Sequence, residues 1–482
     1  MTSIISKLFL IFVLLIILLK WSESVNLNSF ETRYIEVPID HFAATPTSRT
    51  FKLRYLINSK NDANYIEGGP IFLYTGGERE ITIAAQNTGF LFEIAPLFKA
   101  LLIFVEHRYY GTSLPFGNAS FTILENLRYL NTKQALADFA LLIQELKNDF
   151  FSNYTKTTTK TEPIIAIGGY YAGTLSALLR MKYPHLVRAA LTSSAPLFYL
   201  PELTSCEGFY QRVTQVFERY GSERCVKSIK LLWDIIENLT KSKMGMTFIS
   251  STWKLCKKLE TAKDVQTLVD WLRNIFTELS IANYPYASEY YNPVPAYPVM
   301  TFCNKFDTGY LNDTKQFIES FANALQIYTN YTGKTSCNNI YSKEEDLNDV
   351  AWKYQICTEL IMPKCSTEQD MFLTYNWTYE QFALDCYKKF GVRPRPNYIY
   401  LEYGIPNLKY FTNILFSSSA LDPASWGVVD LKKSNKFDKS LMTLQIIDAP
   451  HLMEFRGTNT IDNDYILQAR KFYISILKKW LK

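Results

Sequence analysis

A strand-turn-helix pattern at residues 164–176 is the stretch of this sequence best suited to covalent chemistry. An apolar, β-rich run at 164–167 meets a Gly-Gly turn, and a helix-compatible segment follows at 174–183. This order is that of a nucleophile elbow, in which a sharp turn of the motif Gly-x-Ser-x-Gly exposes a serine hydroxyl above a sheet. Here Gly168 opens the motif, Tyr170 stands at the serine position and Ala172 replaces the second glycine.

Tyr170 is a poor replacement for a serine nucleophile. A phenol with a pKa near 10 is hard to ionise, and an aryl ester forms from an amide less readily than an alkyl ester does. The ring also takes the volume where a scissile carbonyl would sit. No other serine supplies the motif, because residues 111–113 begin a second copy that fails at Pro115, and Ser176 lies well inside the predicted helix.

Two further residues occupy positions suited to an acid and a base. In α/β hydrolases the nucleophile, the acid and the histidine follow one another in this order along the chain. Of the four histidines only His451 comes late enough, directly after a predicted strand at 441–447. Asp422 follows a predicted strand at 410–416, where a carboxylate would hold the imidazole in one tautomer. An Asx-Pro turn is the alternative interpretation of Asp422, and its position after the strand favours the triad.

Short β-rich runs alternate with segments of helical period outside the middle of the chain. Apolar residues recur at helical spacing in residues 132–150 and again at 466–480. Strands that alternate with helices imply a mostly parallel sheet covered on both faces, so the predicted class is α/β. The predicted strands are 50–57, 70–75, 101–106, 164–168, 187–192, 410–416 and 441–447.

All eight cysteines lie between residues 206 and 386. An even number of cysteines in a secreted chain indicates disulfides, and spacing alone leaves 105 pairings for eight. Since none of them shows paired Cys-x-x-Cys spacing, neither zinc nor any other metal or cofactor is expected. Helical patterns at 211–219, 226–240 and 262–280 predict that residues 201–395 form a helical cap, inserted between hydrolase segments at 25–200 and 396–482.

The beginning of the chain has the layout of a secretory signal peptide over residues 1–24. Its apolar run at 8–19 is shorter than the roughly 20 residues that a spanning helix needs, so no membrane anchor is expected after cleavage. A net charge of +5 spread over 482 residues gives no reason to expect a nucleic-acid partner. We expect a secreted or lysosomal glycoprotein with exposed acceptor asparagines at Asn118, Asn153, Asn238, Asn312, Asn330 and Asn376.

Three longer segments, at residues 106–117, 134–139 and 180–187, resemble the prolyl carboxypeptidase family, which includes dipeptidyl peptidase II and the thymus-specific serine protease. The resemblance runs from about Tyr34 to the C-terminus. It implies an α/β-hydrolase fold, a proline-specific serine exopeptidase ancestry, Asp422 and His451 as acid and base, and homodimers as an option. It also implies disulfides joining Cys206 to Cys365, Cys225 to Cys303, Cys256 to Cys337 and Cys357 to Cys386.

The resemblance also places the oxyanion hole. Its donors would be the backbone N–H of Tyr171 and N–H groups of the loop at 74–79, at Gly77 and Glu78. Arg79 stands where the family prefers glycine, so either its side chain crowds the oxyanion hole or the loop tolerates it.

Two other positions depart from the family pattern. Leu452 replaces the second of two adjacent histidines. Ala424 replaces a tryptophan that lines a proline-accepting pocket in the family, and nearby Trp426 is not assumed to substitute for it.

These residues favour a catalytically impaired member of the family that keeps a cleft for peptides, including proline-containing ones. Two alternatives remain open at this stage. One is an active proline-specific exopeptidase with an unrecognised nucleophile, and the other is a structural or interaction glycoprotein that uses only its surface.

Overall fold

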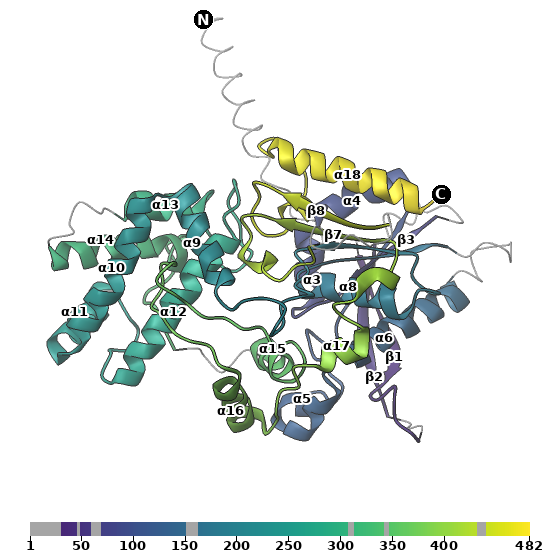
Figure 1. Cartoon of the computed structure of the whole chain (residues 1–482), viewed down its shortest axis with the longest axis horizontal. Coiled ribbons are helices and arrows are strands. Elements are labelled where there is room, and N and C mark those ends of the chain that lie inside the picture. The colour runs from purple at the N-terminus through teal and green to yellow at the C-terminus, as the bar shows by residue number, and fades with distance from the viewer. Residues whose placement is uncertain are drawn as a thin grey trace, which may run out of the picture.

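The computed structural model describes residues 30–45, 49–58, 69–150, 162–306, 313–341, 347–430 and 440–482. The predicted signal peptide at 1–24 lies outside the described residues. Figure 1 shows two parts side by side, a twisted sheet flanked by helices and a group of helices beside it. The chain enters the helical group after the sixth strand and returns to the sheet for the last two strands.

The described residues form one eight-stranded sheet in the order β1-β2-β4-β3-β5-β6-β7-β8. Strands β1, β2 and β4 pair antiparallel, and all other neighbours pair parallel. The central strands are apolar and buried along their whole length, as parallel strands covered on both faces must be. The strands are β1 Phe30–Pro38, β2 Thr50–Asn58, β3 Ile71–Thr75, β4 Leu101–Val105, β5 Ile164–Gly169, β6 Ala189–Ser193, β7 Ile414–Ser419 and β8 Leu441–Ile446.

Two features of the sheet differ from the sequence prediction. Strand β1 was missed, because it is an edge strand with several exposed polar residues and no continuous apolar run. Strand β7 begins at Ile414 rather than at residue 410, because Leu408–Tyr410 forms a 3₁₀ turn ahead of it. The other predicted strands agree with the structure within about two residues.

Helices cover both faces of the sheet, which confirms the predicted α/β class. One face, with Phe72 and Phe104, packs against α3, α4 and α18. The other face, with Leu73 and Ile103, packs against α6 and α8. These helices are α3 Ile81–Asn87, α4 Gly89–Phe98, α6 Thr132–Glu145, α8 Tyr171–Lys182 and α18 Asp464–Trp480, and the shorter α5 spans Ala119–Thr122.

The inserted cap is helical, as predicted. Phe276 on α12 lies at its centre, with ring centroids of Phe217 and Phe302 5.6 Å and 5.7 Å away in edge-to-face contact. The cap and one face of the sheet share a continuous apolar core. The cap helices are α9 Gly208–Tyr220, α10 Glu223–Thr240, α11 Lys243–Thr252, α12 Ala262–Ile281, α13 Pro298–Lys305, α14 Thr314–Thr329, α15 Leu347–Thr358 and α16 Tyr379–Phe390, followed by α17 Tyr398–Tyr403.

Four disulfides staple the cap. They join Cys206 to Cys365, Cys225 to Cys303, Cys256 to Cys337 and Cys357 to Cys386, the pairing that the family resemblance implies. The last of these connects α15 to α16, and these two helices pack on the segment around Tyr109 and Leu130 of the hydrolase part. The cap therefore contacts the hydrolase part through two separate groups of helices.

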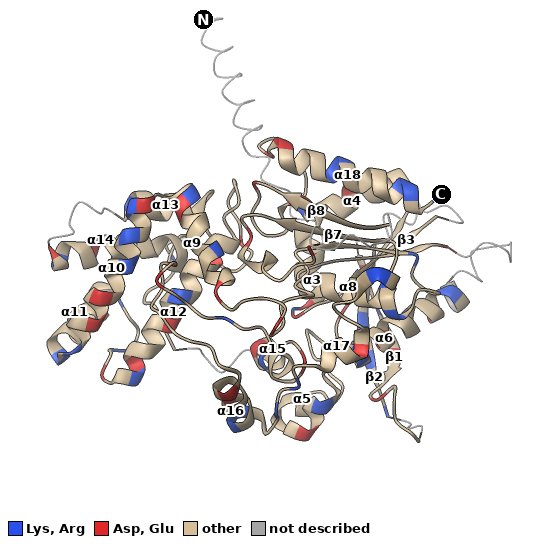
Figure 2. Cartoon of the chain, in the orientation of Figure 1, with Lys and Arg blue, Asp and Glu red and all other residues tan. Residues whose placement is uncertain are grey.

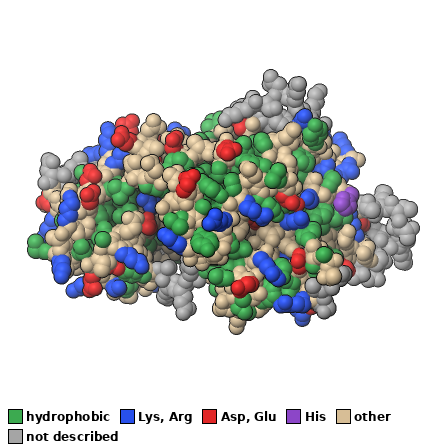
Figure 3. All heavy atoms as spheres, turned by 60° about the horizontal axis from the view of Figure 1, so that its bottom comes forward, with side chains coloured by type: hydrophobic (Ala, Val, Ile, Leu, Met, Phe, Trp, Pro, Cys, Tyr) green, Lys and Arg blue, Asp and Glu red, His purple; other side chains and the backbone are tan. Residues whose placement is uncertain are grey.

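Charged side chains of both signs are mixed over the described part of the chain. Lys and Arg are interspersed with Asp and Glu over both the cap and the sheet part (Figure 2), and the face in Figure 3 shows the same mixture. No helix in the described ranges is long and apolar enough to cross a membrane. Asn118, Asn238 and Asn376 are exposed and Asn330 is half-buried, whereas the acceptor sites at 153 and 312 lie outside the described residues.

Candidate active site

The turn between β5 and α8 has the backbone geometry of a nucleophile elbow. Tyr170 has φ 53° and ψ −124°, a region that costs a non-glycine residue roughly 1 to 3 kcal/mol. Its backbone N–H donates to the carbonyl oxygen of Ser193 at 2.9 Å, which ties the turn to the end of β6. A Cβ on Gly168 would lie 2.4 Å from the carbonyl carbon of Ala172, so only glycine fits there. The elbow is therefore retained although its side chain is a tyrosine.

Asp422 and His451 meet at the carboxyl ends of β7 and β8. Asp422 Oδ2 lies 2.8 Å from His451 Nδ1, and both side chains are buried. The other carboxylate oxygen accepts from the backbone N–H of Ala424 at 2.9 Å. The hydroxyl of Tyr284, from the cap, donates to the carbonyl oxygen of His451 at 2.8 Å. The structure thus brings together the two side chains that the sequence analysis assigns as acid and base.

The phenol of Tyr170 does not use this base. Its hydroxyl donates to Met362 Sδ at 3.8 Å, and its ring lies beside that of Trp352, with centroids 6.0 Å apart. Burial, followed by the negative charges of Glu78 and Asp422, raises the pKa of the Tyr170 phenol well above its usual value. The phenol is therefore neutral across the physiological range.

The loop at 74–79, to which the family resemblance assigns the oxyanion hole, follows β3 and approaches the elbow closely. A Cβ on Gly77 would lie 3.2 Å from the backbone nitrogen of Ala172, so the loop and α8 are in contact. The backbone N–H of Tyr171 belongs to the first turn of α8, where such groups have no intrahelical acceptor. Glu78 faces the cavity in front of the elbow, and burial raises the pKa of its carboxyl group.

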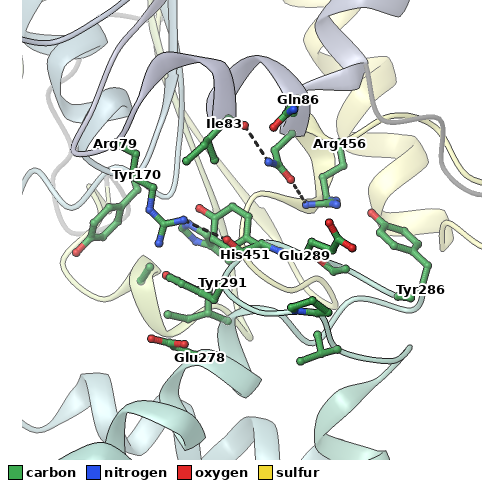
Figure 4. Close-up of a pocket in the computed structure, with 18 of the residues that line it drawn as sticks. Arg79, Ile83, Gln86, Tyr170, Glu278, Tyr286, Glu289, Tyr291, His451 and Arg456 are labelled. Carbon is green, nitrogen blue, oxygen red and sulfur yellow. Dashed lines mark hydrogen bonds between the residues drawn. The ribbon is translucent and has the colours of Figure 1, made fainter. Parts of the chain in front are cut away.

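The side chain of Arg79 extends from this loop to the cap. Its guanidinium carbon lies 4.6 Å from the ring centroid of Tyr291 and 5.2 Å from that of Tyr290. Arg79 Nη1 donates to the carbonyl oxygen of Tyr290 at 3.2 Å. Figure 4 shows the side chain passing Tyr170 toward His451 and Tyr291. The side chain is thus anchored to the cap segment at 290–291.

A large cavity opens in front of the elbow between the hydrolase part and the cap. Its volume is about 1550 Å³, and Tyr170, His451 and Ala424 lie in its wall together with the cap residues Phe209 and Trp352. Figure 4 shows side chains from both parts pointing into this space. The position of the cavity agrees with the prediction of a cap above the carboxyl edge of the sheet.

Trp426 does not take the place of the tryptophan that Ala424 replaces. Its indole Nε1 donates to the carbonyl oxygen of Ser205 at 2.9 Å. A Cβ on Gly208 would overlap its ring, so the indole packs directly against the first residue of α9. Ala424 lines the cavity and Trp426 does not. The wall at this position consequently carries only a methyl group.

Leu452, at the position of the second family histidine, packs behind the elbow. It has φ 52°, in the left-handed region, and a Cβ on Gly169 would lie 2.6 Å from its Cδ1. An apolar side chain thus fills the space next to His451, and no second imidazole is available there.

A buried polar network behind the elbow was not predicted from the sequence. The Tyr171 hydroxyl accepts from Gln355 Nε2 at 2.7 Å and lies 3.2 Å from Thr132 Oγ1. Glu359 accepts from the Thr132 hydroxyl at 2.8 Å and from Gln355 at 3.1 Å. Gln355 is on α15 and Glu359 follows that helix, so this network connects the cap directly to the elbow. No local motif marks it, because its members lie far apart in sequence.

Comparison with known proteins identifies the family. A profile of the family described as serine carboxypeptidase S28 matches residues 37–473. The chain belongs to the S28 family. The lysosomal Pro-X carboxypeptidase of Bos taurus is 39% identical to it, over 96% of this chain and 91% of that protein. The same enzyme of Homo sapiens is 37% identical over 94% and 89%. The thymus-specific serine protease of Mus musculus is 26% identical over 93% and 87%. These similarities confirm the resemblance seen in the sequence.

At this site of the S28 chain, the pair of Asp422 and His451 faces a tyrosine in place of a serine. A serine peptidase needs a hydroxyl that gives its proton to the histidine as it attacks the carbonyl carbon. Here His451 lies next to Asp422, whereas the side chain at the serine position is a phenol whose hydroxyl donates to Met362 Sδ. In the described ranges no group of three or more His, Cys, Asp or Glu side chains could hold a metal ion instead.

Proposed function

We propose that this protein is a non-hydrolytic, peptide-binding member of the S28 family. The observation that carries the proposal is the Tyr170 side chain, which occupies the nucleophile position on an otherwise intact elbow and directs its hydroxyl to Met362 instead of His451. A neutral phenol without a base cannot form the acyl intermediate of a serine peptidase at a useful rate.

The cavity supports peptide binding. A volume of about 1550 Å³ is large enough for several residues of a peptide, and its wall combines aromatic rings with charged groups of both signs. The relatives named Pro-X carboxypeptidase suggest peptides with proline before the last residue as the first ligands to test. Because Ala424 leaves the wall without an indole, we expect a weaker preference for proline than in a site that has one.

We also propose that the protein acts in the lysosome or outside the cell, after removal of residues 1–24. The four disulfides require an oxidising compartment, and the relatives include lysosomal enzymes. Glycans on Asn118, Asn238 and Asn376 would be compatible with their exposure.

The test uses the purified mature chain and the peptide Ala-Ala-Pro-Phe. We expect saturable binding by titration calorimetry, no released phenylalanine by mass spectrometry, and no labelling by a fluorophosphonate probe. His451→Ala is the control, since it removes the only candidate base in the site. Release of phenylalanine by the wild-type protein that disappears in His451→Ala would show an active peptidase and refute the proposal.

A further inference from the structure

Arg79 is a cation in the cavity wall with unused hydrogen-bond donors. An arginine side chain carries five N–H donors. Within the described parts of the chain, Nη1 of Arg79 has an acceptor, the carbonyl oxygen of Tyr290, and its other two nitrogens have none. Nε and Nη2 are accessible to solvent, because neither of them is among the fully buried nitrogens that have no hydrogen-bond partner. Their N–H groups are therefore available to a ligand in the cavity.

The guanidinium is also held in one place. Tyr290 and Tyr291 contact it at 5.2 Å and 4.6 Å, and the two rings stand at 89° to each other with centroids 4.9 Å apart. Stacking on two rings limits the rotamers of a side chain that is otherwise very mobile. A ligand would consequently lose less binding free energy to the ordering of this side chain.

Arg79 forms no ion pair with a carboxylate of the described residues, while the charges of Glu78 and Glu278 act on it from a longer distance. Among the described residues no carboxylate lies within 4.0 Å of its guanidinium, and the two acidic residues that line the cavity near it are Glu78 and Glu278. Burial raises the pKa of both carboxyl groups, and the Tyr328 hydroxyl donates to Glu278. Their negative charge is therefore weakest at the acidic pH of a lysosome.

The two other cations of the cavity are less suited to bind an anion. Arg456 is stacked on Tyr284 at 4.3 Å, its Nη1 donates to the side-chain oxygen of Asn87 at 2.8 Å, and the side chains of Tyr284 and Tyr286 also hydrogen-bond to it. The ammonium of Lys364 lies 4.0 Å from the ring centroid of Phe209, and burial lowers its pKa to about 8. Arg79 remains as the permanently charged group next to the elbow, since Tyr290 contacts both Arg79 and His451.

We propose that Arg79 is a carboxylate-binding site, formed by a residue that stands where the family prefers glycine. The planar guanidinium matches a carboxylate with two parallel hydrogen bonds. The choice of a peptide as the source of that carboxylate rests on the proposed peptide-binding function. A peptide can supply it from its C-terminus or from an Asp or Glu side chain, and we expect the C-terminus because the relatives of this chain are carboxypeptidases.

The test compares Ala-Ala-Pro-Phe as the free acid and as the C-terminal amide, by calorimetry at pH 5.5. We expect the wild-type protein to bind the acid roughly 10-fold or more tightly than the amide, the size of one charge-assisted pair of hydrogen bonds. In Arg79→Gly and Arg79→Gln the acid should bind no better than the amide, and Arg79→Lys should keep part of the difference. The amide Ala-Glu-Pro-Phe-NH₂ tests a side chain as the source.

Lys364→Met is the matched control, because it removes a different cation from the same cavity. It should keep the preference for the acid. A preference that survives Arg79→Gly, or one that is lost in Lys364→Met, would overturn the assignment to Arg79. Tight binding of Ala-Glu-Pro-Phe-NH₂ that depends on Arg79 would assign the carboxylate to a side chain and overturn the C-terminal choice.

A second measurement separates this inference from the proposed function. Hippurate, a small carboxylate, should raise the Tm of the wild-type protein and leave that of Arg79→Gly unchanged. If no peptide binds but hippurate shows this difference, peptide binding is refuted and the carboxylate site stands. If hippurate shifts neither Tm and no acid preference is found, the Arg79 site is refuted.

Discussion

The ring of Tyr170 stands edge-on to the imidazole of His451, with centroids 5.9 Å apart and planes at 77°. The tyrosine therefore packs against the base as a hydrophobic neighbour, while its hydroxyl contacts the sulfur of Met362. Asp422 lies 2.8 Å from the imidazole, so the site differs from a serine triad mainly in the side chain in front of His451. Tyrosine at position 170 is thus compatible with an intact contact between Asp422 and His451.

The buried ion pair of Arg108 and Asp138 should contribute strongly to the free energy of unfolding. Asp138 accepts from Nε and Nη2 of Arg108 at 2.6 Å each, and both side chains are fully buried. Burial alone would raise the pKa of Asp138, but Arg108 and His41 outweigh it and hold that pKa below its usual value. Asp138→Asn leaves Arg108 charged and partly unpaired, so we expect a loss of about 3 to 5 kcal/mol in the free energy of unfolding.

The exposed pair of Arg33 and Glu31 is the matched control. These side chains also form a short ion pair, at 2.6 Å, but they are 32% and 48% exposed. Glu31→Gln should change the free energy of unfolding by less than about 1 kcal/mol. Urea unfolding of both variants measures the difference, and equal effects would contradict the argument from burial.

The carboxyl group of Glu359 should make the protein more stable at acidic pH. It is buried, and desolvation, only partly offset by hydrogen bonds from Thr132 and Gln355, raises its pKa from 4.5 to about 7. Between these pH values the folded protein holds the proton more tightly than the unfolded chain does. This contribution of Glu359 to the free energy of unfolding amounts to roughly 3 kcal/mol. It is fully present below pH 4.5 and is lost as the pH rises through 7.

Glu359→Gln tests this dependence, since glutamine cannot titrate. The variant should have a flatter profile of Tm against pH between 4.5 and 7 than the wild-type protein. The exposed substitution Glu218→Gln serves as a control and should leave the profile unchanged. A wild-type profile that rises toward pH 7, or an unchanged slope in Glu359→Gln, would show that Glu359 does not titrate in this range.

The sequence was informative wherever local pattern and position determine the structure. Strand ends placed Tyr170, Asp422 and His451 at one edge of the sheet, because the loops that follow parallel strands meet there. The sequence was uninformative about contacts between distant segments. The path of Arg79 to Tyr290, the connection of Gln355 to Tyr171 and the orientation of Trp426 all depend on how the cap sits on the sheet, which no local spacing encodes.

The tyrosines at 284, 286, 290 and 291 were the one missed signal within the cap. Four tyrosines in eight residues are unusual for a surface loop, and aromatic side chains are enriched in binding sites. In the structure this segment contacts both Arg79 and Arg456 and forms part of the cavity wall. A search for such clusters in the insert would have found this wall.

The disulfide between Cys357 and Cys386 should stabilise the part of the cap that touches the elbow. The two cysteines are 29 residues apart, and in the chain-entropy model closing such a loop contributes about 3 to 4 kcal/mol. The double variant Cys357→Ala, Cys386→Ala should have a lower Tm and weaker peptide binding, because α15 carries both Trp352 and Gln355. An unchanged Tm, with the loss of the disulfide verified by non-reducing peptide mapping, would contradict this.

Tyr170→Ser tests how far the S28 site has departed from an active one. The elbow backbone and the pair of Asp422 and His451 are in place, so the new hydroxyl should be labelled weakly by a fluorophosphonate probe. Cleavage after proline should recover poorly. The loop at Arg79, the methyl of Ala172 against Gly77 and the open wall at Ala424 all remain, and a single oxyanion donor is worth about 10²- to 10³-fold in rate.

Adding Arg79→Gly, Ala172→Gly and Ala424→Trp to Tyr170→Ser should therefore increase turnover in steps, because each change restores a different requirement of the family site. Turnover is measured as phenylalanine released from Ala-Ala-Pro-Phe between pH 4.5 and 7.5, because His451 must be neutral to act as the base. Tyr170→Ser with His451→Ala is the control and should stay unlabelled.

If Tyr170→Ser alone already reached the turnover of the combined variant, only the nucleophile would have been lost. If the combined variant stayed unlabelled, the assignment of the elbow at Tyr170 as the former nucleophile site would be wrong.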